Sequence, residues 1–586
     1  MDVSHLYTDL SRRSLLKSIA ASAVPLAGAA QNSGTAKGGS LPLYRPSVKF
    51  AEIYSPHPGA DPLLKYNHDV DIDRFKDRYL AAWNANTSSG EHVPGQFNYL
   101  SASPDFERWS LPVRLFTHEG SSENPVEMDN QWQPSFVNYH DEILYCAWCT
   151  FTGRRTFVSH STDGVHWTNV EVPTAPAALQ GQVVGFPTTH GLLTGRDVIM
   201  FPCSLPYAGK FIVGSTRYAA VLMSRDRGKT WEWSEPIEAE SWSQAGENPA
   251  QFGGETIYLW EPSLFEQPDG KIGLLIRNST AQDAPERMEK PHRMILYATS
   301  PDHGAHWTKA RPIEVDSICS RMFALSRVTS PNDLLMVMND WQVGIPQRIS
   351  FDRYFLSLFC APVCDPDLLL PGPVVQPEGG TAFYPNGFVY RDRLYLAYTY
   401  PSGIHSTIID PLPEFSKPFL LPRGGRPGLR IEQRLATLGQ RQSSLGVVLT
   451  AGLTAQPELR LNFRVNVNGY GGTPFTILTL GGKTRGGTAL RAIYDSQEQS
   501  DVLQIRTGGN NWPTLGRFRR RSWMRVECVL GRSGLGISLD GAAAKEFPTA
   551  VLRKICFGGL YEKPDWPQGM QRASDVRIDL DSVSVS

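Results

Sequence analysis

The sequence predicts an all-β chain in which a six-bladed β-propeller is followed by a β-sandwich of the jelly-roll kind. Three observations carry this prediction. The 586 residues include 52 Gly and 44 Pro, a turn-rich composition typical of many short strands. A short segment recurs four times at intervals that suit the blades of a propeller. The last part of the chain, about 150 residues, reads as short runs of alternating apolar and polar residues.

The repeated segment ends in tryptophan each time. Its copies are residues 101–109 (SASPDFERW), 159–167 (SHSTDGVHW), 223–231 (MSRDRGKTW) and 299–307 (TSPDHGAHW). Each reduces to Ser-x-Asp-x-Gly-x-x-Trp or a shortened form, which predicts a hairpin turn. The Asp accepts hydrogen bonds from turn amides, Gly supplies a positive φ, and Trp packs beneath the turn. We therefore assign a structural role to Asp105, Asp163, Asp226 and Asp302.

A blade can be drawn around each repeat, and together the blades fill residues 44–420. Four blades are expected over residues 67–115, 131–173, 186–236 and 259–312. Two more keep only the first hairpin and begin at residues 321–340 and 384–400. The segment 47–54 is expected to add a closing strand to the ring.

A separate β-sandwich is expected after the propeller. Residues 421–430 form a Pro/Gly/Arg-rich linker, and residues 431–586 contain strand-like runs such as LRLNFRVNV and VRIDLDSVSVS. These runs resemble those of laminin-G and concanavalin-like domains, which often accompany glycan enzymes. The resemblance leaves open whether this domain binds glycan or only packs against the propeller.

The N-terminus predicts export. Residues 1–30 have the form of a twin-arginine signal peptide, with Arg12 and Arg13 before an apolar stretch and a small-residue cleavage segment. Residues 31–43 are then a linker. Such a signal implies a periplasmic or secreted protein that is exported already folded.

The composition narrows the partners. The formal net charge is −1, which does not favour nucleic acid or an anionic membrane surface. No later segment has the roughly 18 apolar residues that a membrane span requires. We expect a monomer that binds a poly- or oligosaccharide. No cofactor and no metal site is predicted, although a divalent cation is left open.

Candidate site residues follow from propeller geometry, because ligands bind where the inner strands begin. Each blade offers the start of its first strand and the end of its second. The candidates, in chain order, are His68, Asp69, Glu91, His92, Trp132, Gln133, Arg155, His190, Glu261, Arg277, Arg321 and Tyr384. Carboxylates, imidazoles, arginines and a phenol suit acid–base work on an anionic sugar. Trp132 would stack on a sugar face.

The repeats resemble the Asp-boxes of sialidases, and residues 260–278 (WEPSLFEQPDGKIGLLIRN) look similar to the sialidase segment with a pocket glutamate and a carboxylate-binding arginine. The resemblance gives those roles to Glu261 and Arg277. It implies that Glu261 polarises a tyrosine nucleophile, for which Tyr384 stands at the start of the last blade. Arg321 or Arg327 would be a further arginine of a carboxylate-binding triad.

Blade one departs from the sialidase pattern. Asn67-His68-Asp69-Val70 stands in place of Arg-Ile-Pro, and Glu91-His92 occupies the loop of the sialidase acid. A histidine there resembles the propeller ulvan lyases, the rhamnosyl–glucuronate lyases and a related rhamnosidase family. That resemblance implies His68 and His92 in proton transfer and Arg155 on a uronate carboxylate. The tyrosine of those lyases has no match here, because Trp132-Gln133 stands at its place.

These observations predict an exported, exo-acting glycoside hydrolase of the sialidase superfamily, acting on an acidic or deoxy-sugar glycan. His68, Glu91, His92, Glu261 and Tyr384 are its catalytic candidates. One alternative is a polysaccharide lyase that cleaves uronate-containing glycans by β-elimination. Another is a non-catalytic glycan-binding propeller.

Overall fold

The computed structural model describes two stretches of the chain. These are residues 47–412, apart from 61, 89, 92, 117–129, 151–153, 207–217, 241–256, 279–293, 317–319, 327–332, 340–352, 354–355, 365, 367–369, 375–381 and 401–402, and residues 429–585, apart from 434–444, 448–457, 470–474, 482–487, 498, 507–511, 532–533, 548–553 and 558–575. The predicted signal peptide and the linker at residues 31–43 lie outside the described residues. So do His92 and Arg327.

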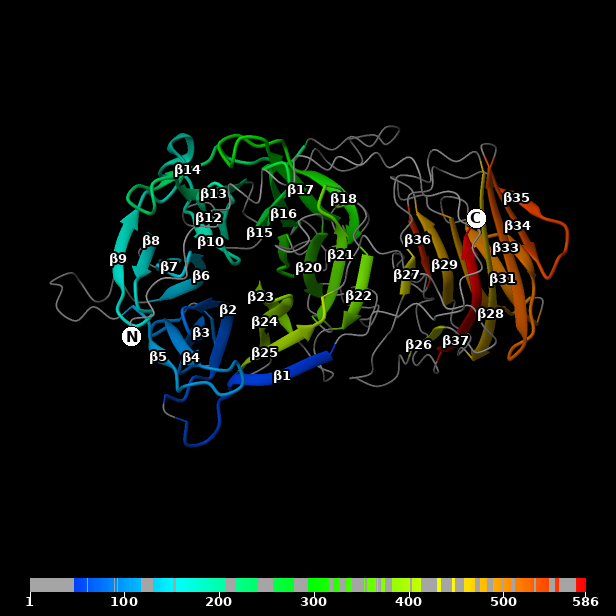
Figure 1. The fold of residues 1–586 in the computed structure, drawn as a ribbon, viewed down its shortest axis with the longest axis horizontal. Helices are drawn as coiled ribbons and strands as arrows, with labels where there is room; N and C mark the ends of the chain where they lie inside the picture. The colour runs from blue at the N-terminus through cyan, green and yellow to red at the C-terminus, as the bar shows by residue number, and fades with distance from the viewer. Residues whose placement is uncertain are drawn as a thin grey trace, which may run out of the picture. The chain divides into compact units, whose positions relative to one another are not determined.

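The described part of residues 47–412 forms six antiparallel sheets, which Figure 1 shows as a ring of strands. The first three contain β2 (Tyr66–Phe75), β3 (Arg78–Asn86), β4 (Phe97–Ser103) and β5 (Val113–Arg114); β6 (Gln131–Tyr139), β7 (Ile143–Thr150), β8 (Thr156–Ser161) and β9 (Thr168–Val172); and β10 (Phe186–Pro187), β11 (Leu192–Leu193), β12 (Ile199–Leu205), β13 (Tyr218–Ser224) and β14 (Glu232–Trp233). The next three contain β15 (Leu259–Glu266), β16 (Ile272–Asn278), β17 (Met294–Ser300) and β18 (Arg311–Asp316); β19 (Phe323–Ser326), β20 (Asp333–Asn339), β21 (Leu356–Pro362) and β22 (Leu370–Val374); and β23 (Phe383–Tyr390), β24 (Arg393–Tyr400), β25 (Gly403–Asp410) and β1 (Ser47–Tyr54). A short 3-10 helix, Ala177–Leu179, follows β9.

Apolar clusters between successive sheets close the ring. One cluster joins Phe75 and Leu80 of the first sheet to Phe136 and Trp148 of the second. Four more continue around the ring, and a sixth joins the last sheet to the first through Tyr395 and the strands β2 and β3. Burial of apolar side chains between sheets therefore holds the blades together.

The closing strand predicted from the sequence is present. β1 pairs antiparallel with β25, from Ser47 opposite Asp410 to Tyr54 opposite Ile404. The first strand of the described chain thus completes the last sheet, so that the two ends of the ring are hydrogen-bonded to each other.

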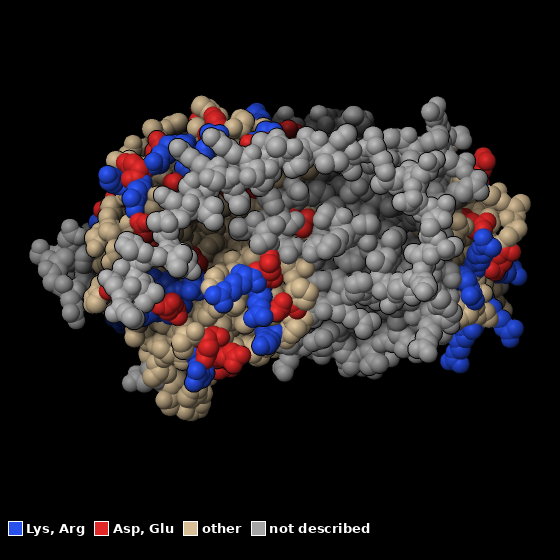
Figure 2. Space-filling view, viewed as in Figure 1, with Lys and Arg blue, Asp and Glu red and all other residues tan. Residues whose placement is uncertain are grey.

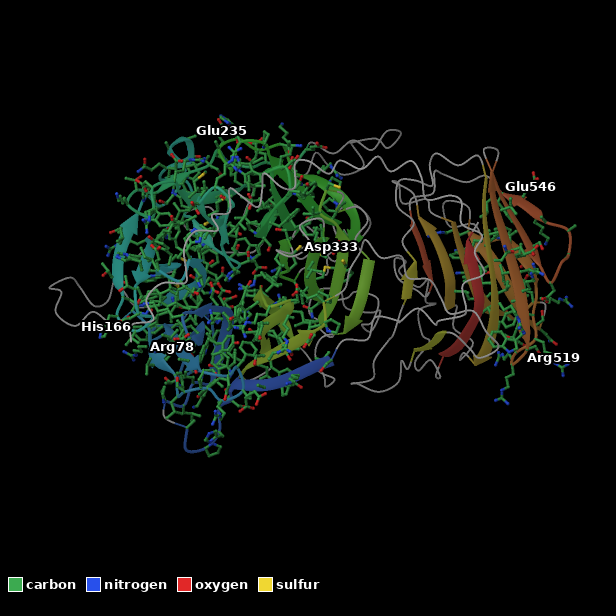
Figure 3. All side chains as sticks on the ribbon, in the orientation of Figure 1. Arg78, His166, Glu235, Asp333, Arg519 and Glu546 are labelled. Carbon is green, nitrogen blue, oxygen red and sulfur yellow. The ribbon has the colours of Figure 1, made fainter. Side chains whose placement is uncertain are left out.

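The four repeats form the predicted turns. In the second repeat the Asp163 carboxylate accepts the amides of Val165 and His166, each at 2.8 Å. Gly164 has a φ of 75°, as the turn requires. Trp167 packs against the cluster between its own sheet and the preceding one. In Figure 3 His166 lies on the outer rim of the ring, away from the inner strands.

The described part of residues 429–585 forms two antiparallel sheets of six strands, as expected for a β-sandwich. One contains β26 (Leu429–Gln433), β37 (Val576–Val585), β28 (Glu458–Gly469), β33 (Trp523–Gly531), β34 (Gly534–Leu539) and β35 (Lys545–Phe547); the other contains β27 (Leu445–Val447), β36 (Lys554–Phe557), β29 (Phe475–Gly481), β30 (Thr488–Asp495), β31 (Ser500–Arg506) and β32 (Thr514–Arg517). Leu461, Phe463 and Val465 alternate along β28 and are buried. β26 begins at Leu429, one residue before the predicted end of the linker.

On the face shown in Figure 2, the described Lys and Arg residues are interspersed with Asp and Glu residues. None of the helices in the described residues is long and apolar enough to cross a membrane.

Candidate active site

Four inner strands carry the same irregularity near their beginning. Their pairing register shifts at His68/Asp71, Trp132/Ser135, Trp260/Ser263 and Phe383/Asn386. Within each shift one residue has a left-handed backbone, with φ between 45° and 60°: Asp69, Gln133, Glu261 and Tyr384. A bulge re-aims a side chain, and non-glycine residues rarely adopt this backbone. All four residues were site candidates from the sequence.

A polar residue two positions after each bulge residue fixes the bulge to the next blade. Asp71 accepts the amide of Phe136 at 2.6 Å. Ser263 accepts the amide of Ala324 at 2.9 Å. Asn386 donates to the carbonyl of Val70 at 3.0 Å, across the closure of the ring. The Ser135 hydroxyl donates to the carbonyl of Thr189.

Three of these bulges coincide with a shared local sequence pattern. Trp132-Gln133-Pro134-Ser135, Trp260-Glu261-Pro262-Ser263 and Phe383-Tyr384-Pro385-Asn386 share the pattern aromatic-x-Pro-Ser/Asn. Proline lacks the N–H that a regular ladder would use, so it suits a bulge. Blade one has Val70 at the proline position and keeps the bulge.

Asp69 is a fixed, buried carboxylate. It is 1% exposed and accepts hydrogen bonds from Trp132 Nε1 at 2.9 Å and Arg321 Nη1 at 3.2 Å. Asn84 donates to it at 3.0 Å in the amide orientation that satisfies both groups. These donors hold its charge in one place. Trp132 is 5% exposed and packs on Phe186, so its stacking on a sugar stays a prediction, and its observed role is to hold Asp69.

Tyr384 lies among arginines. Arg277 Nη1 is 3.0 Å from its hydroxyl and 2.5 Å from Glu261 Oε2. Arg321 lies over its ring, 4.6 Å from the centroid, and Arg353 lies 4.8 Å from the centroid. Burial raises the pKa of Tyr384 to about 12, and the negative charge of Glu261 adds to the rise. The phenol therefore keeps its proton at neutral pH until a base removes it.

Glu91 has the pKa expected of a general acid. Burial raises the pKa of its carboxyl to about 8, with further contributions from the nearby charges of Asp69 and Glu261. Hydrogen bonding to Tyr66 and the charge of Arg353 oppose this rise. At neutral pH the carboxyl is therefore largely protonated and can donate a proton.

His68 lies between Glu91 and Tyr384. Its Nδ1 is 3.0 Å from the Thr399 hydroxyl, and its ring centroid is 4.3 Å from that of Tyr384. His68, Asp69 and Glu91 each present a ligand atom within 4.8 Å of the others, which is a spacing that could hold a metal ion. Asp69 of this group also accepts hydrogen bonds from Arg321 and Trp132.

Two candidates lie elsewhere. Arg155 pairs with Glu171 of β9, with Nε 3.0 Å from Oε1. His190 does not begin its blade, because β10 begins at Phe186 and His190 lies in the break before β11. Its Nδ1 is 3.0 Å from Asp71 Oδ1.

Four residues of the site were missed by sequence reasoning. Asn84 and Thr399 lie near the ends of second strands, where the geometric rule already pointed, but their types attracted no attention. Tyr66 directly precedes the chosen strand start. Arg353 lies shortly before β21, and no local pattern marks it.

The comparisons with known proteins concern shape. No protein-family model matches the chain, and no curated protein does. Among solved structures, a protein of unknown function from Dyadobacter fermentans is similar at 15% identity and a TM-score of 0.44, over 62% of this chain and 99% of that chain. Trypanosoma rangeli sialidase in complex with the inhibitor DANA is similar at 11% identity and a TM-score of 0.45, over 91% of this chain and 96% of that chain. A mutant of that sialidase displaying trans-sialidase activity is similar at 11% identity and a TM-score of 0.44, over 94% and 96% of the two chains.

The chain is thus an all-β protein with a propeller and two further six-stranded sheets.

Proposed function

We propose that the chain is an exported glycoside hydrolase that removes an acidic or deoxy sugar from the end of a glycan. One observation carries this proposal. Arg277 Nη1 donates hydrogen bonds both to the buried Tyr384 hydroxyl and to the buried Glu261 carboxylate, near the point where the inner strands begin. A nucleophile paired with a base and held by a third group is the arrangement that covalent catalysis needs.

The charge of the site favours an anionic sugar. Three carboxyl groups of the site lie near three guanidinium groups, so the fully ionised set would be neutral. The carboxyl groups are those of Asp69, Glu91 and Glu261, and the guanidinium groups are those of Arg277, Arg321 and Arg353. Because the pKa of Glu91 is raised to about 8, the carboxyl is mostly uncharged at neutral pH and the set carries a net positive charge. A carboxylate on the substrate would restore neutrality, and arginine binds carboxylates bidentately.

The acid and the nucleophile have separate roles in the proposed reaction. Glu91 gives its proton to the glycosidic oxygen as the bond to the leaving group breaks. The Tyr384 oxygen attacks the anomeric carbon, and the phenol proton passes to the Glu261 carboxylate. Water then attacks the glycosyl–tyrosine, giving a proton to the Glu91 carboxylate, while Tyr384 recovers the proton from Glu261.

Gln133 is a candidate for binding a substrate hydroxyl. It is a bulge residue, 2% exposed, and its Oε1 has no hydrogen-bond partner among the described residues. A buried acceptor without a donor is costly, and a sugar hydroxyl would satisfy it. We propose that Gln133 orients the sugar ring through this oxygen.

A second candidate function is β-elimination on a uronate-containing glycan. It is favoured by the 4.3 Å approach of the His68 and Tyr384 rings, because a base and an acid beside an arginine cluster would serve proton abstraction next to a carboxylate. The pairing of Arg155 with Glu171 gives no support to Arg155 as the carboxylate-binding residue, and Arg277 or Arg321 would have to replace it.

The two functions give different products from one assay. A panel of sialylated, uronate-containing and rhamnose-containing oligosaccharides is incubated with the enzyme and followed by reducing ends and by ultraviolet absorbance. The hydrolase proposal predicts new reducing ends without absorbance. An unsaturated product that absorbs ultraviolet light would instead support the lyase function. Binding without cleavage would favour a glycan-binding propeller.

A further inference from the structure

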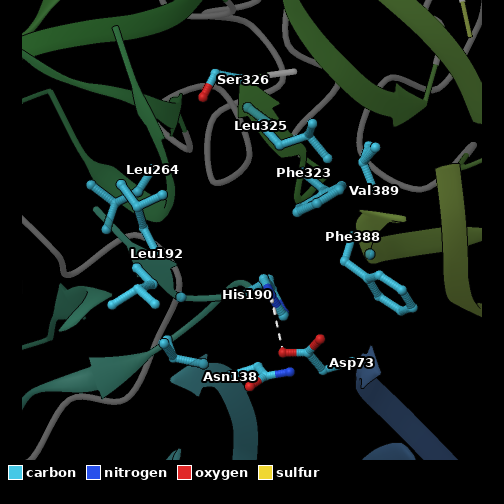
Figure 4. A pocket seen from close by; sticks show the side chains of 15 residues that line it. Asp73, Asn138, His190, Leu192, Leu264, Phe323, Leu325, Ser326, Phe388 and Val389 are labelled. Carbon is cyan, nitrogen blue, oxygen red and sulfur yellow. Dashed lines mark ion pairs between the residues drawn. The ribbon is translucent and has the colours of Figure 1, made fainter. Parts of the chain in front are cut away.

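A second polar group lies further along the same inner strands, inside an apolar pocket (Figure 4). Its polar side chains are Asp73, Asn138, His190 and Ser326, and its apolar wall includes Leu192, Leu264 and Phe323. On each of the four bulged strands and in blade five, the pocket residues lie two to five positions after the site candidate of the same blade. These site candidates are Asp69, Gln133, Glu261, Arg321 and Tyr384. At about 3.3 Å per residue this separation is roughly 7–16 Å, so the pocket is distinct from the candidate active site.

The walls of the pocket are rigid. Leu264 belongs to the apolar cluster between the third and fourth sheets, and Phe323 to the cluster between the fifth and sixth. Leu192 and Phe388 pack against two such clusters as well. Because these four wall residues are anchored in the core between blades, much of the wall is formed before any ligand arrives, which lowers the entropic cost of binding.

The polar groups are aimed by their neighbours. Asp71 accepts the amide of Phe136 and binds His190 Nδ1 at 3.0 Å, which fixes the imidazole ring. Asp73 Oδ1 accepts the amide of Arg74 at 2.7 Å. His190 Nε2 and Asp73 Oδ2 then face each other 3.8 Å apart at the pocket, as the dashed line in Figure 4 marks.

This distance suits one bridging oxygen. It is too long for a direct hydrogen bond, but an oxygen atom can lie about 2.8 Å from both groups. Burial lowers the pKa of His190, but the charge and hydrogen bond of Asp71, with the charge of Asp73, raise it overall to about 9. Burial raises the pKa of Asp73 to about 7, although the charge of His190 opposes this rise. Between about pH 7 and 9, Nε2 therefore carries a proton and donates, while the ionised Asp73 oxygen accepts.

We propose that this pocket binds a neutral molecule with an apolar body and one hydroxyl group, whose oxygen accepts from His190 and donates to Asp73. An ammonium group has no lone pair to accept the His190 proton, and a carboxylate has no proton to donate to Asp73, whereas a hydroxyl group can do both. The apolar walls favour a carbon ring or short chain over a fully hydroxylated sugar. The site would thus be a ligand site separate from glycan cleavage.

Three probes with one carbon skeleton test the proposal: cyclohexanol, cyclohexylamine and cyclohexanecarboxylate. Saturation-transfer NMR and titration with the full-length protein are expected to show cyclohexanol binding, with the amine and the carboxylate at least about tenfold weaker. Equal or tighter binding of either charged probe, or no binding of cyclohexanol, would overturn the proposal. The measurement needs no glycan, so its failure leaves the proposed hydrolase activity untouched.

Two variants locate the bound alcohol. His190→Phe removes the donor, and Leu264→Trp fills the pocket while keeping both polar groups. Each is expected to weaken cyclohexanol binding at least about tenfold. His166→Phe, an exposed histidine on the outer rim in Figure 3, is the matched control and is expected to bind as the parent does. Circular dichroism establishes that each variant is folded, and full binding by folded Leu264→Trp would contradict the proposal.

Discussion

Carboxyl groups occur in two contrasting environments in this molecule. One set lies in the turns formed by the four repeats (the box turns), and the other lies near the bulges of the inner strands. Asp226 is partly exposed, and hydrogen bonds from the Thr230 hydroxyl and amide lower its pKa to about 2. Glu91 is partly buried near other carboxylates, and desolvation raises its pKa to about 8. The turn aspartates are therefore permanent anions that hold a loop, whereas Glu91 can exchange a proton near neutral pH. Position in the propeller, and not residue type, decides which carboxyl is suited to chemistry.

The largest expected difference is in turnover. Glu261→Gln removes the proposed base beside Tyr384 while keeping the shape of the side chain, and kcat is expected to fall about 10²–10⁴-fold. Asp226→Asn, the matched change in a box turn, is expected to stay within about twofold of the parent because it acts on loop stability alone. Steady-state kinetics on the cleaved oligosaccharide measures both. Equal losses in the two variants would remove the distinction between the two sets of carboxyls.

The pH dependence of turnover follows from Glu91. As the proposed acid it must be protonated, so kcat/KM is expected to fall as pH rises through about 8. In Glu91→Gln this limb disappears and kcat/KM is lower at every pH below it. A descending limb that stays unchanged in Glu91→Gln would assign the proton to another group.

Stability should depend on pH in opposite ways for the two sets. A carboxyl with a raised pKa contributes stability below its unfolded value, 4.5 for Glu91, and loses it as pH rises through about 8. A carboxyl with a lowered pKa, such as Asp302 at about 2 against 3.8, contributes above its unfolded value and loses it as pH falls. Glu91→Gln is thus expected to flatten the decline of Tm as pH rises from 4.5 to 8. Asp302→Asn is expected to flatten the decline of Tm as pH falls below 3.8. Thermal unfolding across pH measures this, and the reverse assignment would contradict it.

The smallest effect concerns the turn geometry alone. Gly164 and Gly181 have φ of 75° and 78°, but an added Cβ would lie 3.1 Å from Leu80 only at Gly164. Changing either glycine to alanine should cost about 1 kcal/mol of unfolding free energy for the left-handed backbone, with a further contribution at Gly164 from crowding. Denaturant unfolding compares them, and a larger loss in Gly181→Ala would be inconsistent with the packing described for this turn.

The sequence predicted the repeating parts of the molecule better than the assembled site. The box turns are local, since Ser161, Asp163 and Gly164 contact one another within four residues, and so their structure could be read directly. Glu261, Arg277 and Tyr384 were found because strand starts in a propeller converge on one axis. Arg353 was missed because it lies shortly before β21 and comes to Tyr384 only through the closed ring.

The raised pKa of Glu91 could not be predicted from the sequence either. It depends on burial and on charges from two other blade positions, Asp69 and Glu261, which are brought together by bulges. The aromatic-x-Pro-Ser/Asn pattern at residues 132–135, 260–263 and 383–386 could have located three of those bulges. The inter-blade hydrogen bonds that fix them are properties of the fold.

The most direct test of the account is the chemical state of Tyr384 during turnover. Enzyme quenched with acid while it cleaves an acidic oligosaccharide is digested, and its peptides are weighed by mass spectrometry. The account predicts a peptide containing Tyr384 that is heavier by one glycosyl residue and absent from Tyr384→Phe. Efficient turnover by Tyr384→Phe, or a glycosyl group attached to another residue, would contradict it.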